Sequence, residues 1–164
     1  SIGGTLSIDS TPGRGSTISL RLPLSVAIIH ALLVSCGELL LAVPVSAISS
    51  TCEIPLDKII QRGRHQFFEK DGHEIPLRNL PVFFRQNAAR PEHGVVPILL
   101  TESNKQPVGL LVDRLLGQQE LFTRPLTHPL ADLRGLSGSC LLGNGQIVFV
   151  VDPNACSSRT YTEN

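Results

Sequence analysis

The sequence predicts a mainly all-β protein in which two small barrel lobes share a core and follow a separate β-hairpin. Short apolar segments recur at regular spacing with turn signals between them, which is typical of small β-sandwiches and barrels. No long amphipathic segment lies between them that could form the crossover helix of a parallel sheet. The same order of strand, turn and strand also occurs twice, and lobes of only about five strands each usually share a core.

The first 23 residues are predicted to form a hairpin with one apolar face. Apolar and polar residues alternate on both sides of a glycine-rich turn at residues 11–15. A lone hairpin is at best marginally stable in water, so we expect this one to pack on the residues after it or to be the edge of another domain. Pro23 ends the second strand, and the apolar residues 24–31 show no alternation, which favours a buried connector that includes His30.

From residue 32 onward, the chain contains one structural unit twice. Each copy begins with two apolar strands around a polar turn, at 32–34 and 39–43 in the first copy and at 96–100 and 108–112 in the second. Each continues with further strands, at 48–53 and 66–69 in the first copy and at 118–124 and 139–142 in the second. Each ends in a tight glycine turn, where Gly or Asn supplies the positive φ of a short hairpin. We interpret this pattern as a duplication and place the bridge between the lobes in the polar residues 85–94.

Composition and charge argue against several classes of function. The chain has 14 basic and 14 acidic residues, 4% aromatic residues and no Trp. It lacks both a basic excess to neutralise phosphates and aromatic residues to stack on bases, so we expect no nucleic-acid partner. The four cysteines form no C-x-x-C pair and the five histidines have no partner at ligand spacing, so we predict reduced thiols and no metal site. The apolar stretch at residues 24–34 is too short to span a membrane.

Two short motifs resemble catalytic or phosphate-binding sites only weakly. Residues 135–139 are similar to a nucleophile elbow, but they lead into a strand where that motif requires a helix. Gly13, Gly15 and Ser16 could cradle a phosphate through their backbone N–H groups, but the turn lacks the Lys of a P-loop and opens a strand. We therefore predict binding and no catalysis. An enzyme, the rival class, would need a cleft with convergent polar groups.

Five segments carry a resemblance to a known family. Residues 3–24 resemble the last strands of the ATP-binding domain of histidine kinases, with Gly15-Ser16 where that family usually has Gly-Thr. Residues 24–34 are similar to the junction that follows this domain in CheA, the family of chemotaxis histidine kinases. Residues 42–45, 109–120 and 137–145 then match the CheW-like regulatory domain in the expected order, and the motif at 109–120 is the most specific.

This resemblance implies a domain organisation for the whole chain. Residues 1–23 would be a remnant of the ATP-binding domain, with Gly13, Gly15 and Ser16 as its leftover turn, and residues 24–31 a connector. Residues 32–156 would be a CheW-like regulatory domain, built from two intertwined SH3-like five-stranded barrels. Residues 157–164 would be a polar tail.

The resemblance also implies a function. The chain would dock its kinase onto a CheW adaptor and onto the cytoplasmic tips of chemoreceptors, so that receptor state controls autophosphorylation. It would act in the cytoplasm, at membrane receptor arrays. It would hold no cofactor and catalyse nothing, whereas the parent kinase would bind ATP and Mg²⁺ and dimerise through domains absent from this chain. A stand-alone scaffold of the CheW type is the alternative, and only the N-terminal hairpin argues against it.

Runs of consecutive large apolar residues supply candidates for the docking surface. Successive residues of a strand point to opposite faces of a sheet, so one member of each run is expected to face solvent. An extra exposed apolar side chain marks an interaction patch. The candidates are Leu39, Leu40, Leu41, Phe67, Phe68, Phe83 and Phe84. The other interpretation is that they fill a large core shared by both lobes. The family commonly has an aromatic residue where Leu41 stands.

Overall fold

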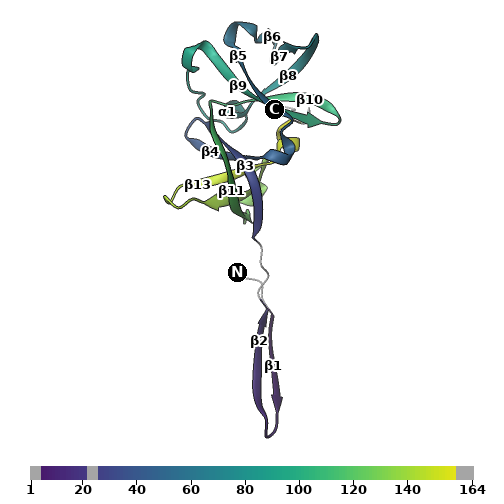
Figure 1. The fold of residues 1–164 in the computed structure, drawn as a ribbon, viewed down its shortest axis with the longest axis vertical. Helices are drawn as coiled ribbons and strands as arrows, with labels where there is room; N and C mark the ends of the chain where they lie inside the picture. Colours follow the sequence, from purple (N-terminus) through teal and green to yellow (C-terminus); the bar gives the residue numbers. More distant parts are fainter. Residues whose placement is uncertain (1–4, 22–25, 158–164) are drawn as a thin grey trace.

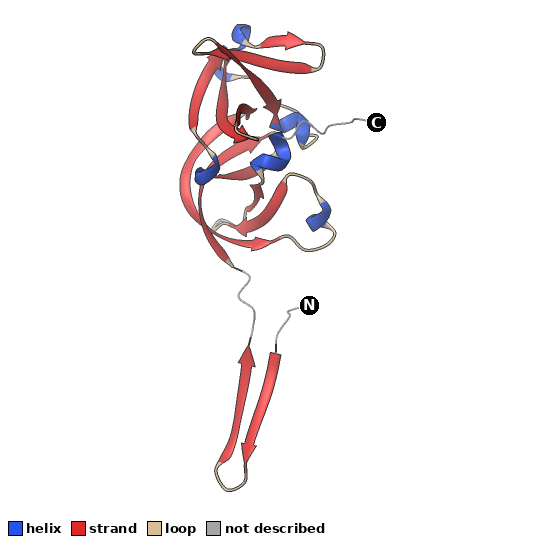
Figure 2. Ribbon diagram, turned by 90° about the vertical axis from the view of Figure 1, so that its right-hand side faces the viewer, coloured by secondary structure: helices blue, strands red, loops and turns tan. Residues whose placement is uncertain are grey.

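The computed structural model describes residues 5–21 and 26–157. Two β-rich lobes lie one on the other, and a hairpin projects away from them (Figure 1). A view turned by 90° shows the same separation and the short helices beside the sheets (Figure 2). The mainly β fold that the sequence predicts is therefore confirmed.

The hairpin consists of β1 (Thr5–Thr11) and β2 (Gly15–Arg21), which pair antiparallel along their full length. Gly13 (φ 82°) and Gly15 (φ 88°) form the turn with positive φ, which glycine adopts without steric cost. The predicted hairpin is confirmed. The predicted strand end at Pro23 lies outside the described residues.

The lobe nearer the hairpin is a closed barrel with the strand order β11-β12-β13-β4-β3. Its strands are β3 (Ala27–Cys36), β4 (Leu39–Pro44), β11 (Arg114–Pro125), β12 (Leu136–Leu141) and β13 (Ile147–Val151). The connector predicted at residues 24–31 is corrected, because residues 27–31 are the first half of β3. This stretch shows no alternation of apolar and polar residues because most residues of β3 before Ala31 are exposed and residues 31–34 are all buried. His30 is exposed and not buried as expected.

The other lobe is a six-stranded sheet with the order β5-β9-β10-β8-β7-β6. Its strands are β5 (Ser50–Pro55), β6 (Ile60–Arg62), β7 (His65–Lys70), β8 (His73–Asn79), β9 (Val95–Ser103) and β10 (Gln106–Leu111). The sheet has one strand more than expected because the short β6 pairs with β7 at its edge. Two short helices, α1 (Leu80–Phe83) and α2 (Pro153–Ser157), follow β8 and β13.

The two copies of the duplication exchange their first hairpins. The β3–β4 hairpin of the first copy completes the barrel of β11, β12 and β13, and the β9–β10 hairpin of the second copy joins β5, β7 and β8. In both lobes the second strand of the exchanged hairpin pairs in parallel with the strand that precedes a short helix. β4 pairs with β13, Ala42 opposite Val150, and β10 pairs with β8, Gly109 opposite Leu77. Residues 85–94 therefore connect the two copies but join elements of one sheet, which corrects their expected role as a bridge between lobes.

Buried side chains form three clusters, one inside each lobe and one between the lobes. Successive residues of β3 point to opposite faces, so Leu33 lies inside the barrel and Val34 in the cluster between the lobes. Val34 is accompanied there by Leu99 and Leu110 of the other sheet. The two lobes share a core, as their small size predicts.

Candidate docking surface

The outside of the closed barrel carries two exposed apolar pairs. Ile28 of β3 lies directly opposite Phe122 of β11, with 60% and 64% of their surfaces exposed. Leu141 of β12 lies opposite Ile147 of β13, with 69% and 55% exposed. Side chains of directly opposed residues are close enough to touch, so each pair presents one continuous apolar surface. We call these four residues the outer barrel patch.

The two pairs lie on the same side of neighbouring strands. Arg124 of β11 is opposite Ser139 of β12, so the antiparallel register places Leu141 further along β12 in the direction of Phe122. Their inward neighbours Leu121 and Cys140 are buried inside the barrel, which confirms that the patch residues point outward. The sheet therefore presents an apolar outer surface that its own chain does not cover in the described residues.

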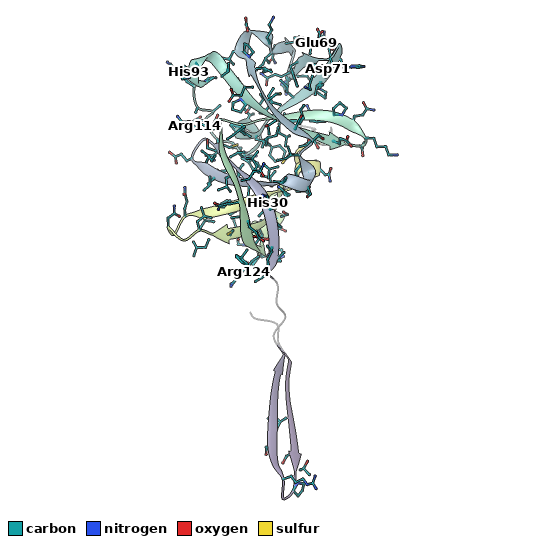
Figure 3. The ribbon with its side chains drawn as sticks, in the orientation of Figure 1. His30, Glu69, Asp71, His93, Arg114 and Arg124 are labelled. Atoms are coloured by element: carbon teal, nitrogen blue, oxygen red, sulfur yellow. The ribbon has the colours of Figure 1, made fainter. Side chains whose placement is uncertain are left out.

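Polar groups flank the outer barrel patch. The next pair along β3 and β11 is His30 with Glu120, and both side chains are exposed. Figure 3 labels His30 on β3 and Arg124 near the end of the barrel. An apolar centre with a polar margin is the usual anatomy of a protein interface. None of the described strands β5 to β10 carries an exposed large apolar residue, so this feature belongs to the closed barrel.

The structure places the predicted run of leucines in the core. Leu41 is fully buried in the cluster between the lobes. Leu39 is half-buried against the same cluster, and Leu40 is half-buried against the barrel interior. The expectation that one of them faces solvent is corrected, because β4 is covered on one side by the barrel interior and on the other by the second lobe.

The four predicted phenylalanines also pack within the molecule. Phe68 is buried inside the six-stranded sheet, and Phe67 is half-buried with the Arg62 guanidinium 5.6 Å from its ring centroid. Phe83 and Phe84 lie at the end of α1 and not on a strand, so strand alternation does not apply to them. Their rings meet edge to face at 4.9 Å and pack against the cluster between the lobes.

Asp113 fastens the lobes at the point where the chain passes from β10 to β11. Its carboxylate accepts the backbone N–H of Gly37 at 2.6 Å, in the β3–β4 turn, and that of Ala89 at 3.0 Å, in the segment between the copies. Its own backbone N–H donates to the Ser35 carbonyl at 3.0 Å. The Asp113 side chain therefore joins two distant segments to its own, which gives a physical role to the motif at residues 109–120.

The cysteines have the properties of core residues. Burial raises the pKa of Cys36 and of Cys156 to about 12, with further increases from the negative charges of Asp113 and Asp152 respectively. Burial also raises the pKa of Cys52. A protonated thiol is a poor nucleophile and metal ligand. Within residues 5–21 and 26–157, no three metal-binding side chains come together.

The turn at Gly13, Gly15 and Ser16 is exposed at the tip of the hairpin, and a Cβ at either glycine would meet no other atom within 4 Å. The short helices of the described chain are not long and apolar enough to cross a membrane. The exposed apolar pairs that sequence reasoning missed are formed by Ile28, Phe122, Leu141 and Ile147.

Residues 30–160 match the model of the family described as CheW-like domain. The chain belongs to the CheW-like domain family. This match covers most of the barrel and the entire six-stranded sheet. A CheW-like domain is non-catalytic.

The CheW-like chain is similar to chemotaxis proteins of several bacteria. It is 32% identical over 155 residues to the chemotaxis protein CheA of Bacillus subtilis and 32% identical over 154 residues to the sensor histidine kinase CheAY of Helicobacter pylori. The matches cover 94% of this chain but only 23% and 19% of those proteins, so the chain spans about a quarter of their length or less.

Its fold is also that of a solved CheW structure. The scaffolding protein TtCheW of Thermoanaerobacter tengcongensis superposes with a TM-score of 0.63 at 14% identity, over 77% of this chain and 90% of that one. The predicted SH3-like CheW fold is thus confirmed. The chain is therefore a CheW-like domain with homology to the CheW-like regions of chemotaxis CheA proteins.

Proposed function

We propose that this CheW-like domain is the regulatory coupling domain of a CheA-type chemotaxis histidine kinase. It docks the kinase to a CheW adaptor and to chemoreceptor cytoplasmic tips, so that receptor state controls autophosphorylation at a cytoplasmic array. The main support is that similarity to CheA proteins covers 94% of the chain, whereas the CheW-like family match begins at residue 30. A match of that length must include much of the hairpin.

The outer barrel patch supports a docking role for the closed barrel. Exposed large apolar side chains in contact with one another mark interaction surfaces on soluble proteins. Ile28 with Phe122 and Leu141 with Ile147 form such surfaces on paired strands of the closed barrel. A partner that covers them gains apolar burial without having to order the strands first. We assign the CheW contact to this patch.

The hairpin is the part of the chain that links this domain to kinase chemistry. We propose that residues 1–23 belong to the ATP-binding domain of the parent, and that the parent binds ATP and Mg²⁺ and dimerises through its other domains. Gly13, Gly15 and Ser16 are then structural residues of a hairpin tip. The isolated chain is expected to bind no ATP in calorimetry, and micromolar binding would contradict this assignment.

A reconstituted mixture of receptor cytoplasmic fragments, CheW and CheA tests the proposal. The isolated chain should bind CheW in calorimetry and should lower receptor-stimulated kinase activity, because it competes with the coupling domain of the intact kinase. Phe122→Asp should lose both effects. If the chain neither binds CheW nor changes kinase activity, the assignment is wrong.

A stand-alone scaffold is the second candidate, and the superposition on TtCheW over 90% of that chain favours it. The same mixture separates the two candidates. A scaffold of the CheW type should restore receptor control of the kinase when CheW is left out. A kinase coupling domain should not restore it and should only compete.

A further inference from the structure

A proline–leucine turn occurs once in each copy of the duplication. Residues 55–59 read Pro-Leu-Asp-Lys-Ile, and residues 129–133 read Pro-Leu-Ala-Asp-Leu. Each forms one turn of 3₁₀ helix, η2 (Leu56–Lys58) in the six-stranded lobe and η4 (Leu130–Asp132) in the closed barrel. In both, the N–H of the last of the five residues donates to the leucine carbonyl, at 3.2 Å in the first turn and 3.0 Å in the second. The two turns are therefore equivalent elements.

The first turn packs against its own sheet, whereas the second faces solvent. Ile59 is half-buried against the core cluster of the six-stranded sheet, and with Leu56 it lines a hollow of about 230 Å³. Leu133, the equivalent of Ile59, is 48% exposed and belongs to none of the core clusters that the described residues form. Leu130 is 42% exposed. The second turn thus presents two apolar side chains that its own lobe leaves uncovered.

An insertion in the second copy explains this difference. Phe122 and Pro55 occupy equivalent places, because each lies opposite the residue eight positions before the end of its neighbouring strand, β3 or β9. The first turn begins directly at Pro55, whereas Pro129 follows Phe122 by seven residues. The added residues extend β11 to Pro125, where it pairs with β12, and then form an exposed loop. The turn is therefore carried away from the interior of the barrel.

The loop that carries η4 is held by its own hydrogen bonds. The Ala131 N–H donates to the Thr127 carbonyl at 3.0 Å. The His128 ring and the Asp132 carboxylate also meet, with Nδ1 and Oδ2 3.2 Å apart. A partner can therefore cover the two leucines without first ordering the turn, which lowers the entropic cost of docking.

The same end of the barrel receives the chain from the hairpin. Thr123 lies opposite Ala27, the first residue of β3, and its hydroxyl donates to the Ala27 carbonyl at 3.3 Å. Ala27 follows Arg21, the last residue of the hairpin, by six residues. Six extended residues span at most about 22 Å. The domain that contains the hairpin must therefore lie beside the end of the barrel from which the η4 loop emerges.

We propose that the η4 loop docks on the ATP-binding domain of the parent kinase, with Leu130 and Leu133 as its apolar contact. The inference rests on the proposed function, which assigns the hairpin to that domain. Two half-exposed leucines offer far less area than the roughly 800 Å² per partner of a standard interface, which argues against an independent partner. A domain tethered by a short linker has an effective concentration in the millimolar range, so a small contact is enough. The contact sets the orientation of the coupling domain relative to the ATP-binding domain.

Hydrogen exchange can compare the η4 loop in the isolated chain with the same loop in the parent kinase. The amides of residues 126–134 should exchange at least about tenfold more slowly in the parent, because docking opposes their opening to water. The turn at residues 55–59 should exchange equally in both proteins. Leu133→Asp in the parent should restore fast exchange, and Leu130→Asp should do the same. Neither should lower Tm, because both leucines lie on the surface of the isolated chain.

Leu56→Asp is the matched control, because Leu56 has the same place in the equivalent turn and is 46% exposed. It should leave the η4 loop protected in the parent. Leu133→Asp should also lower receptor-stimulated autophosphorylation about fivefold or more, since the coupling between the two domains is lost. It should leave the Kd for CheW unchanged. Phe122→Asp should do the reverse, with weaker CheW binding and an η4 loop that stays protected.

Equal exchange of the η4 loop in the isolated chain and the parent would overturn the inference. So would protection that survives Leu133→Asp, that Leu56→Asp removes, or that appears only when CheW is added, because the last result would make the loop a CheW contact. Failure of the isolated chain to bind CheW would contradict the proposed function instead, and the exchange comparison does not depend on that result.

Discussion

Replacement of Phe122 by Asp should remove most of the affinity for a CheW adaptor and leave the fold intact. Phe122 is 64% exposed, which for a Phe side chain corresponds to about 130 Å² that a partner can cover. At about 25 cal/mol per Å², this area contributes about 3 kcal/mol, or about a 200-fold change in Kd. Association also costs freedom of motion, so this value is an upper bound, and we expect Kd to rise by at least about tenfold.

Calorimetry would measure the Kd, and thermal unfolding followed by circular dichroism would measure stability. The contact of Phe122 with Ile28 stabilises the barrel by at most about 1 kcal/mol, so Tm should fall by no more than about 4 °C. Val82→Asp is the matched control, because Val82 is 65% exposed but lies on α1, outside the outer barrel patch. Wild-type affinity of Phe122→Asp, or an equal loss in Val82→Asp, would refute the reasoning.

Three further predictions concern the core, the fastening of the lobes and the thiols. Leu41→Ala should cost about 2–5 kcal/mol in unfolding free energy, measured in urea, because Leu41 is fully buried between the lobes; a cost near zero would mean that Leu41 is not core. Asp113→Ala should lower Tm by about 6–12 °C, because two hydrogen bonds to a carboxylate are lost; an unchanged Tm would contradict the fastening role. Burial raises the pKa of Cys36 and Cys156 from 9.0 to about 12, so only the unfolded chain ionises readily, and urea stability should be constant below about pH 9 and fall above it; constant stability up to pH 11 would show that the thiols are not buried.

The hairpin and most strands could be predicted from the sequence because their signals are local. The high glycine content around Gly13 predicts the turn. The alternation of apolar and polar residues on either side of it depends only on neighbouring residues. The start of β3 was missed because its residues 27–30 are largely exposed and then followed by residues buried on both faces. Such a strand has no period of two in hydrophobicity.

The docking surface could not be predicted, because exposure depends on what covers each sheet. Leu41 and Phe122 both stand in strands beside other apolar residues, and sequence alone cannot separate them. The second lobe covers the side of β4 on which Leu41 lies, whereas nothing in the described chain covers Phe122. One usable signal was available: Phe122 is a large apolar residue in the otherwise polar stretch from Gln118 to Arg124, apart from its inward neighbour Leu121.

The sequence by itself determined that the chain is mainly β, contains one strand unit twice and carries CheW-like motifs. Turns, the alternation of apolar and polar residues, and motifs each depend on short stretches of residues. Only the tertiary structure decided that the two copies exchange their hairpins, since two equivalent hairpins can complete either lobe and local signals are the same in both arrangements. That exchange buries Leu41 of β4 between the lobes and leaves Ile28 and Phe122 on the surface.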